Sequence, residues 1–263
     1  MTTNLPPTGA PRLRRSCLAV PEVRGVIERR VLVNFRCAPA TVAALLPPPF
    51  RPKLVGGFAV AGICLIRLTA LRPAGLPASI GLTSENAAHR IAVEWEENGI
   101  VREGVFIPRR DTDSWLNRLA GGRLFPGVHQ AAAFRVWETG QRFKLEMRGA
   151  DGTTFVRVLA RLTDTLPRGS VFGTLAGATR FFQAGALGWS ARATTGAFDG
   201  LELDCDLGHL EPLAVEHVAS SFFNDARYFP PGTAEFDSAF LMRNIAHRWI
   251  GRGRMECGGG AAP

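Results

Sequence analysis

The sequence predicts a β-rich α+β protein in which antiparallel strands form a closed or nearly closed barrel or cone around an internal pocket. Strand-like runs outnumber helical ones, a tight-turn dipeptide such as Asn98-Gly99 separates neighbouring strands, and the few helical runs are short. Many hairpin-connected strands with few helices favour an antiparallel sheet that closes on itself. A barrel of this kind encloses room for a small ligand.

The first quarter of the chain predicts two strands with a helix between them. Residues 26–36 read as a strand, and residues 39–46 read as a short helix that begins at Pro39 and ends before Pro47. Residues 57–71 form a long apolar strand or a bent pair of strands. Within it, Gly62 marks a bulge or a close approach of another backbone.

The middle of the chain predicts a hairpin and a three-stranded meander. Residues 90–97 and 100–108 flank Asn98-Gly99, a type I′ turn signal, and a helix-like run follows at residues 111–120. The meander comprises residues 132–138, 142–148 and 153–163. In its second strand Phe143, Leu145 and Met147 alternate with polar residues, so one face is apolar.

The last third predicts one helix and several strands. Residues 173–186 read as a helix because small residues surround the Phe181-Phe182 pair. Residues 187–195, 201–207 and 214–223 read as strands, whereas residues 236–250 fit a helix or a strand equally well. We therefore expect a single domain over residues 25–250, with a disordered leader at 1–24 and a flexible tail at 251–263.

The charge of the chain is a weak guide to function. The formal net charge is +8, which favours an anionic partner, but 29 of the 31 basic residues are arginines and they are scattered. No helix-turn-helix, RNA-recognition or zinc-finger pattern accompanies them. Binding to nucleic acid is thus the weakest of the functions we consider.

Several other classes lack their signatures in the sequence. No apolar run is long enough to span a membrane, and the amino-terminal residues lack the apolar core of a secretory signal. The five cysteines are widely spaced with no Cys-x-x-Cys, which is typical of reduced thiols, and Cys37 and Cys64 are expected in the core. No serine-hydrolase elbow or dinucleotide fingerprint is present. We expect a cytoplasmic protein without a metal or a cofactor.

A series of short motifs, taken in order, resembles the acetoacetate decarboxylase superfamily. It starts with the charged strand around Glu28-Arg29-Arg30 and the Leu45-Leu46-Pro47 turn, and continues with residues 71–77 (LRPAGLP) and 83–86 (TSEN). Residues 121–130 (GGRLFPGVHQ) resemble the turn that precedes the family's lysine pair. Gly173-Thr174-Leu175, Trp189 and residues 210–213 resemble later elements of an uncharacterised branch. The resemblance covers residues 25–250.

The resemblance implies a β-rich cone with an interior pocket, into which Glu85 and the Phe125 to His129 turn point. In the family, one lysine after the Phe-Pro turn forms a Schiff base with the substrate, but here Gly127-Val128-His129 follow Phe125-Pro126. The chain has only Lys53 and Lys144, and neither lies at the motif. Schiff-base chemistry requires a suitably placed lysine. We therefore expect the decarboxylase reaction to be lost.

The remaining candidates point to proton transfer and to carboxylate binding. Glu85 and His129 are the predicted acid–base pair, and Arg29, then Arg90, are predicted to hold a substrate carboxylate, with Phe125 beside it. The favoured interpretation is an enzyme, a lyase or an isomerase, that acts on a small organic acid or carbonyl compound. The alternative is a non-catalytic small-molecule binder or sensor. Formation of a homo-oligomer is left open.

Overall fold

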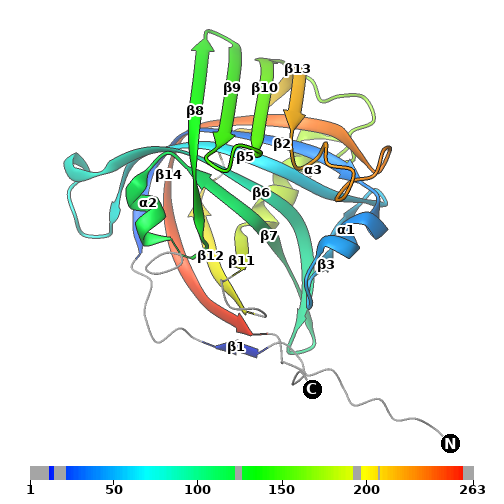
Figure 1. Ribbon diagram of the computed structural model, residues 1–263, viewed down its shortest axis with the longest axis horizontal. Helices are drawn as coiled ribbons and strands as arrows, with labels where there is room; N and C mark the ends of the chain where they lie inside the picture. Colours follow the sequence, from blue (N-terminus) through cyan, green and yellow to red (C-terminus); the bar gives the residue numbers. More distant parts are fainter. Residues whose placement is uncertain (1–11, 15–21, 122–125, 192–196, 207, 257–263) are drawn as a thin grey trace, which may run out of the picture.

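The computed structural model describes residues 12–14, 22–121, 126–191, 197–206 and 208–256 (Figure 1). Strands make up 62% of the structure, so the β-rich prediction is confirmed. The helices are α1 Pro39–Leu45, α2 Trp115–Ala120 and α3 Leu175–Ala184, with a 3-10 turn η1 at Ala78–Ile80. The strands are β1 Arg12–Arg14, β2 Val23–Cys37, β3 Arg51–Pro52, β4 Leu54–Val55, β5 Phe58–Pro73, β6 Leu82–Glu97, β7 Ile100–Thr112, β8 His129–Thr139, β9 Arg142–Gly149, β10 Phe155–Leu162, β11 Leu187–Ala191, β12 Ala197–Cys205, β13 Glu211–Ser220 and β14 Ala234–Glu256.

All fourteen strands belong to one sheet that closes on itself twice. One ring of hydrogen bonds passes through the nine strands β7, β8, β9, β10, β13, β14, β2, β5 and β6. A second closed path runs from β7 through β11, β12, β14, β2, β5 and β6 back to β7. The two paths have β14, β2, β5, β6 and β7 in common, and we call these five strands the shared wall.

Two strand pairings differ from the predicted antiparallel arrangement. β7 pairs in parallel with β11 at residues 105–107 and with β8 at residues 110–112, both along the edge that does not pair with β6. Parallel neighbours need a crossover connection rather than a tight turn. The chain supplies it, because α2 lies between β7 and β8, and α3 precedes β11 (Figure 1).

The shared wall has apolar side chains on both faces. On β2 and β5, Val31, Val33 and Ile63 belong to one apolar cluster, whereas Leu32 and Cys64 belong to the other. The first cluster also contains residues of β9, β10 and β13, and the second contains Phe172, Phe181 and Phe182 from α3 and the segment before it. Because successive side chains on a strand point to opposite faces, neighbours in the sequence pack in different clusters.

The local signals read from the sequence are largely confirmed. Asn98 and Gly99 have φ angles of 53° and 76° and form the two-residue turn between β6 and β7. A Cβ on Gly62 would lie 2.3 Å from the carbonyl oxygen of Val33, so Gly62 is a site of close backbone approach. The meander β8–β9–β10 is present, with Phe143 buried on its apolar face.

The ends of three predicted segments are revised. The ambiguous run at residues 236–250 is part of β14, where pairing with β2, β12 and β13 outweighs its helix-like pattern. β7 extends to Thr112, so only the second half of the helix predicted at residues 111–120 is helical. β2 begins at Val23, and β14 continues to Glu256 into the predicted tail. Within the described part of the chain, no helix is both long and apolar enough to cross a membrane.

Candidate functional site

A cavity of about 640 Å³ lies on one side of the shared wall. It is lined from all seven strands of the second closed path and from α2 and α3. Its volume is in the range of sites that hold small organic ligands. Most of its walls are apolar, with side chains such as Ile66 and Leu68 on β5, Leu201 and Leu203 on β12, and Phe182 on α3.

Arg90 on β6 is the most deeply buried cation that lines this cavity. Only 6% of the residue is exposed. Its guanidinium donates a hydrogen bond to Asn34 Oδ1 and lies 5.0 Å from the ring centroid of Phe182. Its Nε has no partner among the described residues. Burial lowers the pKa of Arg90 to about 10, so the group is still charged at neutral pH.

Arg110 and His129 form a second polar region of the cavity wall. They are partners in the register of β7 and β8. Arg110 Nε donates to Ser190 Oγ at 3.1 Å, and burial lowers the pKa of Arg110 to about 10. Burial, together with the charge of Arg110, lowers the pKa of His129 to about 4. His129 is therefore a neutral imidazole near pH 7.

The hydrogen bond of His129 indicates its tautomer. Nδ1 lies 3.1 Å from the carbonyl oxygen of Gly127, which can only accept, so Nδ1 carries the proton. Nε2 is then an unprotonated acceptor, the form that a general base requires. Gly121 makes this placement possible, because a Cβ there would lie 2.5 Å from His129 Nδ1.

Arg30 on β2 and Cys64 on β5 complete the polar end of the cavity. Both line it, and Arg30 Nε donates to Cys64 Sγ at 3.3 Å. Among the described residues, no carboxylate pairs with Arg30, Arg90 or Arg110. An unpaired cation in a low-dielectric site attracts an anion strongly. The polar end of the cavity thus presents three guanidinium groups that have no carboxylate partner among the described residues.

The carboxylates that line the same cavity have arginine partners of their own. Asp111 pairs with Arg109 at 2.7 Å. Glu202 pairs with Arg252, and Asp204 pairs with Arg248. These acids therefore do not neutralise the three cavity arginines.

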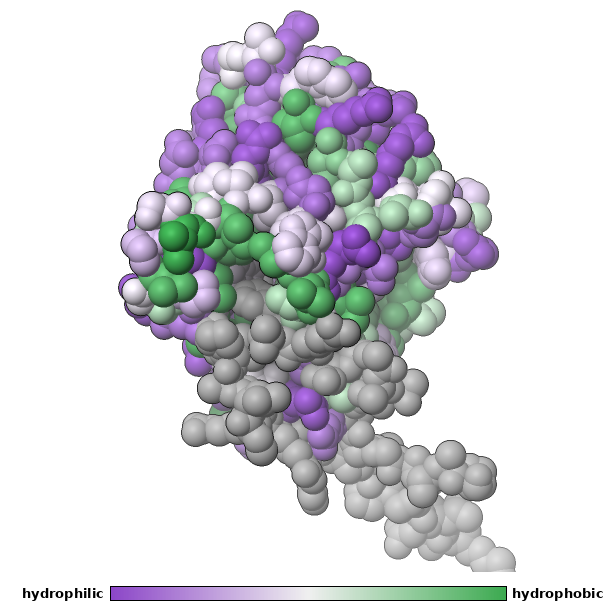
Figure 2. Space-filling view, turned by 60° about the vertical axis from the view of Figure 1, so that its left-hand side comes forward, coloured by the Kyte–Doolittle hydropathy of each residue, from purple (hydrophilic) through white to green (hydrophobic). Residues whose placement is uncertain are grey.

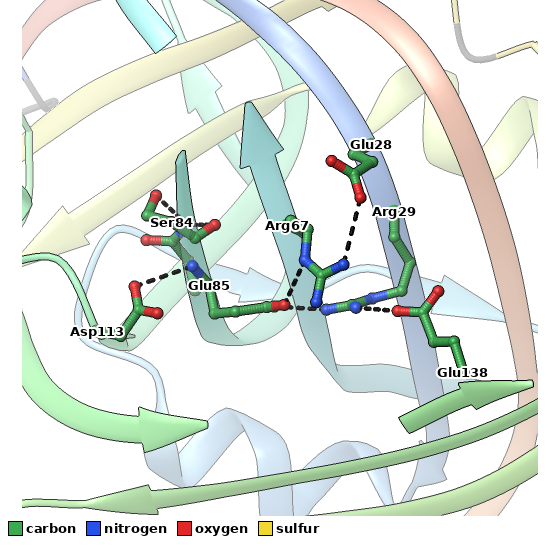
Figure 3. Close-up of polar contacts among 8 residues, drawn as sticks. Glu28, Arg29, Arg67, Ser84, Glu85, Asp113 and Glu138 are labelled. Atoms are coloured by element: carbon green, nitrogen blue, oxygen red, sulfur yellow. Dashed lines mark hydrogen bonds and ion pairs between the residues drawn. The ribbon is translucent and has the colours of Figure 1, made fainter. Parts of the chain in front are cut away.

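The opposite face of the shared wall carries a separate ion cluster (Figure 3). Arg29, only 2% exposed, pairs with Glu85 at 2.5 Å and also with Glu138 from β8. Arg67 Nε binds the second oxygen of Glu85 at 2.7 Å, and its NH1 lies 3.3 Å from Glu28. Both oxygens of Glu85 are thus engaged, and the cluster is internally paired.

The structure separates residues that the sequence analysis placed in one pocket. Arg90 and His129 line the cavity, but Glu85 and Arg29 do not; they face the side on which Glu138 lies. The reason is strand alternation, which turns Asn86 toward the cavity and Glu85 away from it. Glu85 and His129 are therefore not brought together in this cavity. Phe125 lies outside the described residues.

Arg110 and Cys64 were not among the predicted site residues, and Arg29 was preferred to its neighbour Arg30. For Arg30 the signal was present but ambiguous. Ile27 packs on the cavity side of β2, so alternation from Ile27 places Arg29 on the cavity face. Val31 packs on the opposite side, so alternation back from Val31 places Arg29 on that opposite side and Arg30 on the cavity face. A register shift between Ile27 and Arg29 decides for the second count.

Comparison with solved structures reveals the relatives of this architecture. An acetoacetate decarboxylase-like enzyme from Sphingomonas wittichii RW1 superposes with a TM-score of 0.59 at 15% identity, over 90% of this chain and 93% of that one. Acetoacetate decarboxylase from Legionella pneumophila gives 0.59 at 11% identity, over 89% and 86%. This chain has the acetoacetate decarboxylase-like fold. The predicted resemblance is confirmed at the level of the fold.

The same fold is found in the solved structure of the enduracididine biosynthesis enzyme MppR in complex with pyruvate. It gives a TM-score of 0.56 at 12% identity, over 89% of each chain. No protein-family model matches the sequence, and no curated protein matches it. The likeness to this fold is therefore structural.

Within this acetoacetate decarboxylase-like fold, neither lysine lines the main cavity. Lys144 pairs with Glu146 at 3.4 Å on β9. Lys53 pairs with Glu103 at 2.5 Å and lines a small void of about 30 Å³, whose walls also include Arg30 and Arg90. Neither lysine amine therefore lies in the main cavity, where an imine with a bound ligand would have to form.

Proposed function

We propose that this protein binds a small organic acid in the 640 Å³ cavity, with the ligand's carboxylate on Arg30, Arg90 and Arg110. The observation that carries the proposal is Arg90, a buried cation without a carboxylate partner among the described residues. Burying a charge costs free energy unless a counterion compensates it. A ligand carboxylate supplies that counterion, and the planar guanidinium binds it in a fork geometry.

Two further observations support an acid as the ligand. Most of the walls beyond the arginines are apolar, as in sites that accept organic molecules of low polarity. MppR, whose structure has the same fold, has been solved in complex with pyruvate, a small 2-oxo acid. Many surface arginines, by contrast, are paired with acids, for example Arg36 with Glu235 at 2.7 Å and Arg243 with Glu211 at 2.8 Å. The free energy gained by binding an anion is therefore larger in the cavity than at these paired surface arginines.

The binding proposal is tested by isothermal titration calorimetry with pyruvate, hexanoate and octanoate. We expect the wild type to bind at least one of these acids. Arg90→Met should weaken that binding by tenfold or more, because a hydrogen bond to a charged group contributes about 1.5–3 kcal/mol. Arg36→Met is the matched control, since it removes a surface arginine that is already paired. Unchanged affinity in Arg90→Met would refute the proposal.

His129 supports a second candidate function, acid–base catalysis of the lyase or isomerase type. Its unprotonated Nε2 belongs to a cavity residue, and its neighbour Arg110 is placed to stabilise an enolate that forms next to the carboxylate. In this mechanism His129 removes the proton from the carbon beside the carbonyl of a bound oxo acid. Glu85 has no part in this step.

Deuterium exchange detects this step directly. Nuclear magnetic resonance in heavy water should show enzyme-dependent exchange at the carbon next to the carbonyl of a bound 2-oxo acid. His129→Gln should abolish exchange and retain binding. If the wild type binds the acid but never exchanges its protons, the protein is a non-catalytic binder or sensor.

Borohydride reduction in the presence of pyruvate tests whether imine chemistry is absent. We expect no lysine adduct in the mass spectrum, because Lys53 is paired with Glu103 and Lys144 with Glu146. An adduct on Lys53 would overturn this expectation. Lys53→Met would then be the variant that confirms the assignment.

A further inference from the structure

We infer that the ligand is an amphiphilic acid, with its carboxylate at the buried arginine end of the cavity and an unbranched apolar chain that extends toward Leu71 and Leu82. This inference rests on the proposed function and adds to it the shape and orientation of the ligand. It follows from the order in which polar and apolar residues line the shared wall.

The three arginines meet a short stretch of β5. In the strand register, Gly62 is the partner of Arg90, and Ile66 is the partner of Arg30. Cys64, midway between them, pairs with Ala88, which in turn pairs with Arg110. β5 is fully buried from residue 59 to residue 66. The cationic end of the cavity is therefore its buried end.

Apolar residues continue from this end along the same two strands. Ile66 and Leu68 are buried, Leu71 is half-buried, and Leu82, its register partner on β6, is 40% exposed. All four line the cavity. The path from Cys64 to Leu71 spans about 23 Å, at roughly 3.3 Å per strand residue. Exposure rises along this path, so its far end is the mouth of the cavity.

The facing wall is also apolar along this path. Leu201 and Leu203 on β12 and Trp249 on β14 line it. The acids between and beside them, Glu202 and Asp204, pair with Arg252 and Arg248. An apolar chain in this space removes hydrocarbon from water without leaving a protein charge unpaired.

The mouth itself exposes apolar side chains. Leu119 on α2 is 54% exposed and lines the cavity together with Leu82 and Leu116. Figure 2 turns forward the side of the molecule that carries α2, and hydrophobic residues gather on that face. Arg72, a fourth arginine of the cavity lining, donates to the carbonyl oxygens of Ala70 and Leu76. Exposed apolar side chains around a cavity entrance are typical of a binding site for an apolar group.

A chain-length series tests the inference. Calorimetry with butanoate, hexanoate, octanoate and decanoate should show Kd falling by about threefold to fourfold for each added methylene. Octanol, which has the chain without the charge, should bind at least tenfold more weakly than octanoate. Octanedioate, with a second carboxylate at the far end, should also bind more weakly than octanoate.

Two kinds of variant distinguish the contribution of the ligand's carboxylate from that of its apolar chain. Arg90→Met should weaken binding of every acid by a similar factor. Leu82→Ser should weaken decanoate at least fivefold and leave butanoate unchanged, and Leu119→Ser is the second variant if Leu82→Ser is poorly folded by circular dichroism. If short and long acids bind equally and the mouth variants have no effect, the amphiphile inference is wrong but the proposed function stands. If no acid binds at all, both are wrong.

Discussion

Arg29 and Arg30 are adjacent on β2, yet Arg29 pairs with Glu85 and Glu138, whereas Arg30 faces the cavity beside Cys64. The shared wall therefore separates a neutralised ion cluster from a cavity whose cations have no protein counterion among the described residues. Two chemically identical neighbours should for this reason respond differently to the same substitution.

Replacing Arg29 should destabilise the fold, and replacing Arg30 should not. Arg29→Met leaves Glu85 and Glu138 without their shared cation, which costs about 3–5 kcal/mol for a buried pair. Arg30→Met removes a cation that has no carboxylate partner among the described residues, so the free energy of unfolding should change by less than about 1 kcal/mol. Urea denaturation of the two variants measures both values. Equal losses in the two variants would contradict the separation of the two faces.

Cys64 should react preferentially with anionic reagents. Arg30 donates to its sulfur, and Arg90 and Arg110 flank it in the strand register. The rate of alkylation by iodoacetate relative to iodoacetamide should be about tenfold higher at Cys64 than at a small thiol in solution, because the arginines attract the carboxylate. Peptide mass spectrometry gives the two rates site by site.

The other buried cysteine among the described residues provides the internal control. Burial raises the pKa of Cys37 to about 12, so Cys37 should be labelled slowly by both reagents. Arg30→Met should reduce the preference for iodoacetate at Cys64. A preference that survives in Arg30→Met and Arg90→Met would show that these cations do not create it.

Mild acid should destabilise the protein through its buried histidines. Burial, aided by the charge of Arg109, lowers the pKa of His89 to about 4, and the ring packs against Phe222 with no hydrogen-bond partner among the described residues. In the unfolded chain a histidine has a pKa near 6.5. Between these two values the unfolded state binds more protons than the folded state, so stability falls as the pH falls from about 6.5 to 4.

The contribution of His89 is measured as a difference between variants. His89→Leu should make the free energy of unfolding less dependent on pH in this window, by an amount on the order of 3 kcal/mol across it. His217, an exposed histidine on β13, gives the matched control His217→Leu. An identical pH dependence in the wild type and His89→Leu would contradict the prediction.

Gly62 should be intolerant of any side chain. A Cβ at this position would lie 2.3 Å from the Val33 carbonyl oxygen, and backbone cannot move aside as a flexible side chain can. Gly62→Ala should therefore cost more than about 2 kcal/mol, in the range of other overpacked core sites. Gly185→Ala is the control, because its Cβ would meet atoms no closer than 3.5 Å. Thermal unfolding of both variants tests the difference.

Sequence reasoning predicted the fold better than the site. Turn dipeptides, proline positions and alternation are local signals, and they identified the hairpin at Asn98-Gly99, the helix at α1 and the meander around Phe143. Parallel pairing of β7 with β8 and β11 was not predicted, because it depends on contacts between distant segments.

The site was predicted only in part, for a related reason. Arg90 and His129 line the cavity, whereas Arg29 and Glu85 do not, and telling the two pairs apart required knowing the phase of each strand. The register shift between Ile27 and Arg29 changes that phase by one residue. No turn residue or proline in β2 indicates the shift in the sequence. Cys64 was predicted only to be a core residue, because its neighbours in the cavity come from other strands.

The shared wall also affects how this protein can change through mutation. Substitutions at Asn86, Ala88 or Arg90 reshape the ligand space, while Glu85 and His89 retain their contacts on the other side. Mutations at one set of alternating positions in β6 can therefore change ligand preference, while selection for folding stability acts on the other set. A one-residue insertion in β6 would exchange the two sets and abolish both properties together.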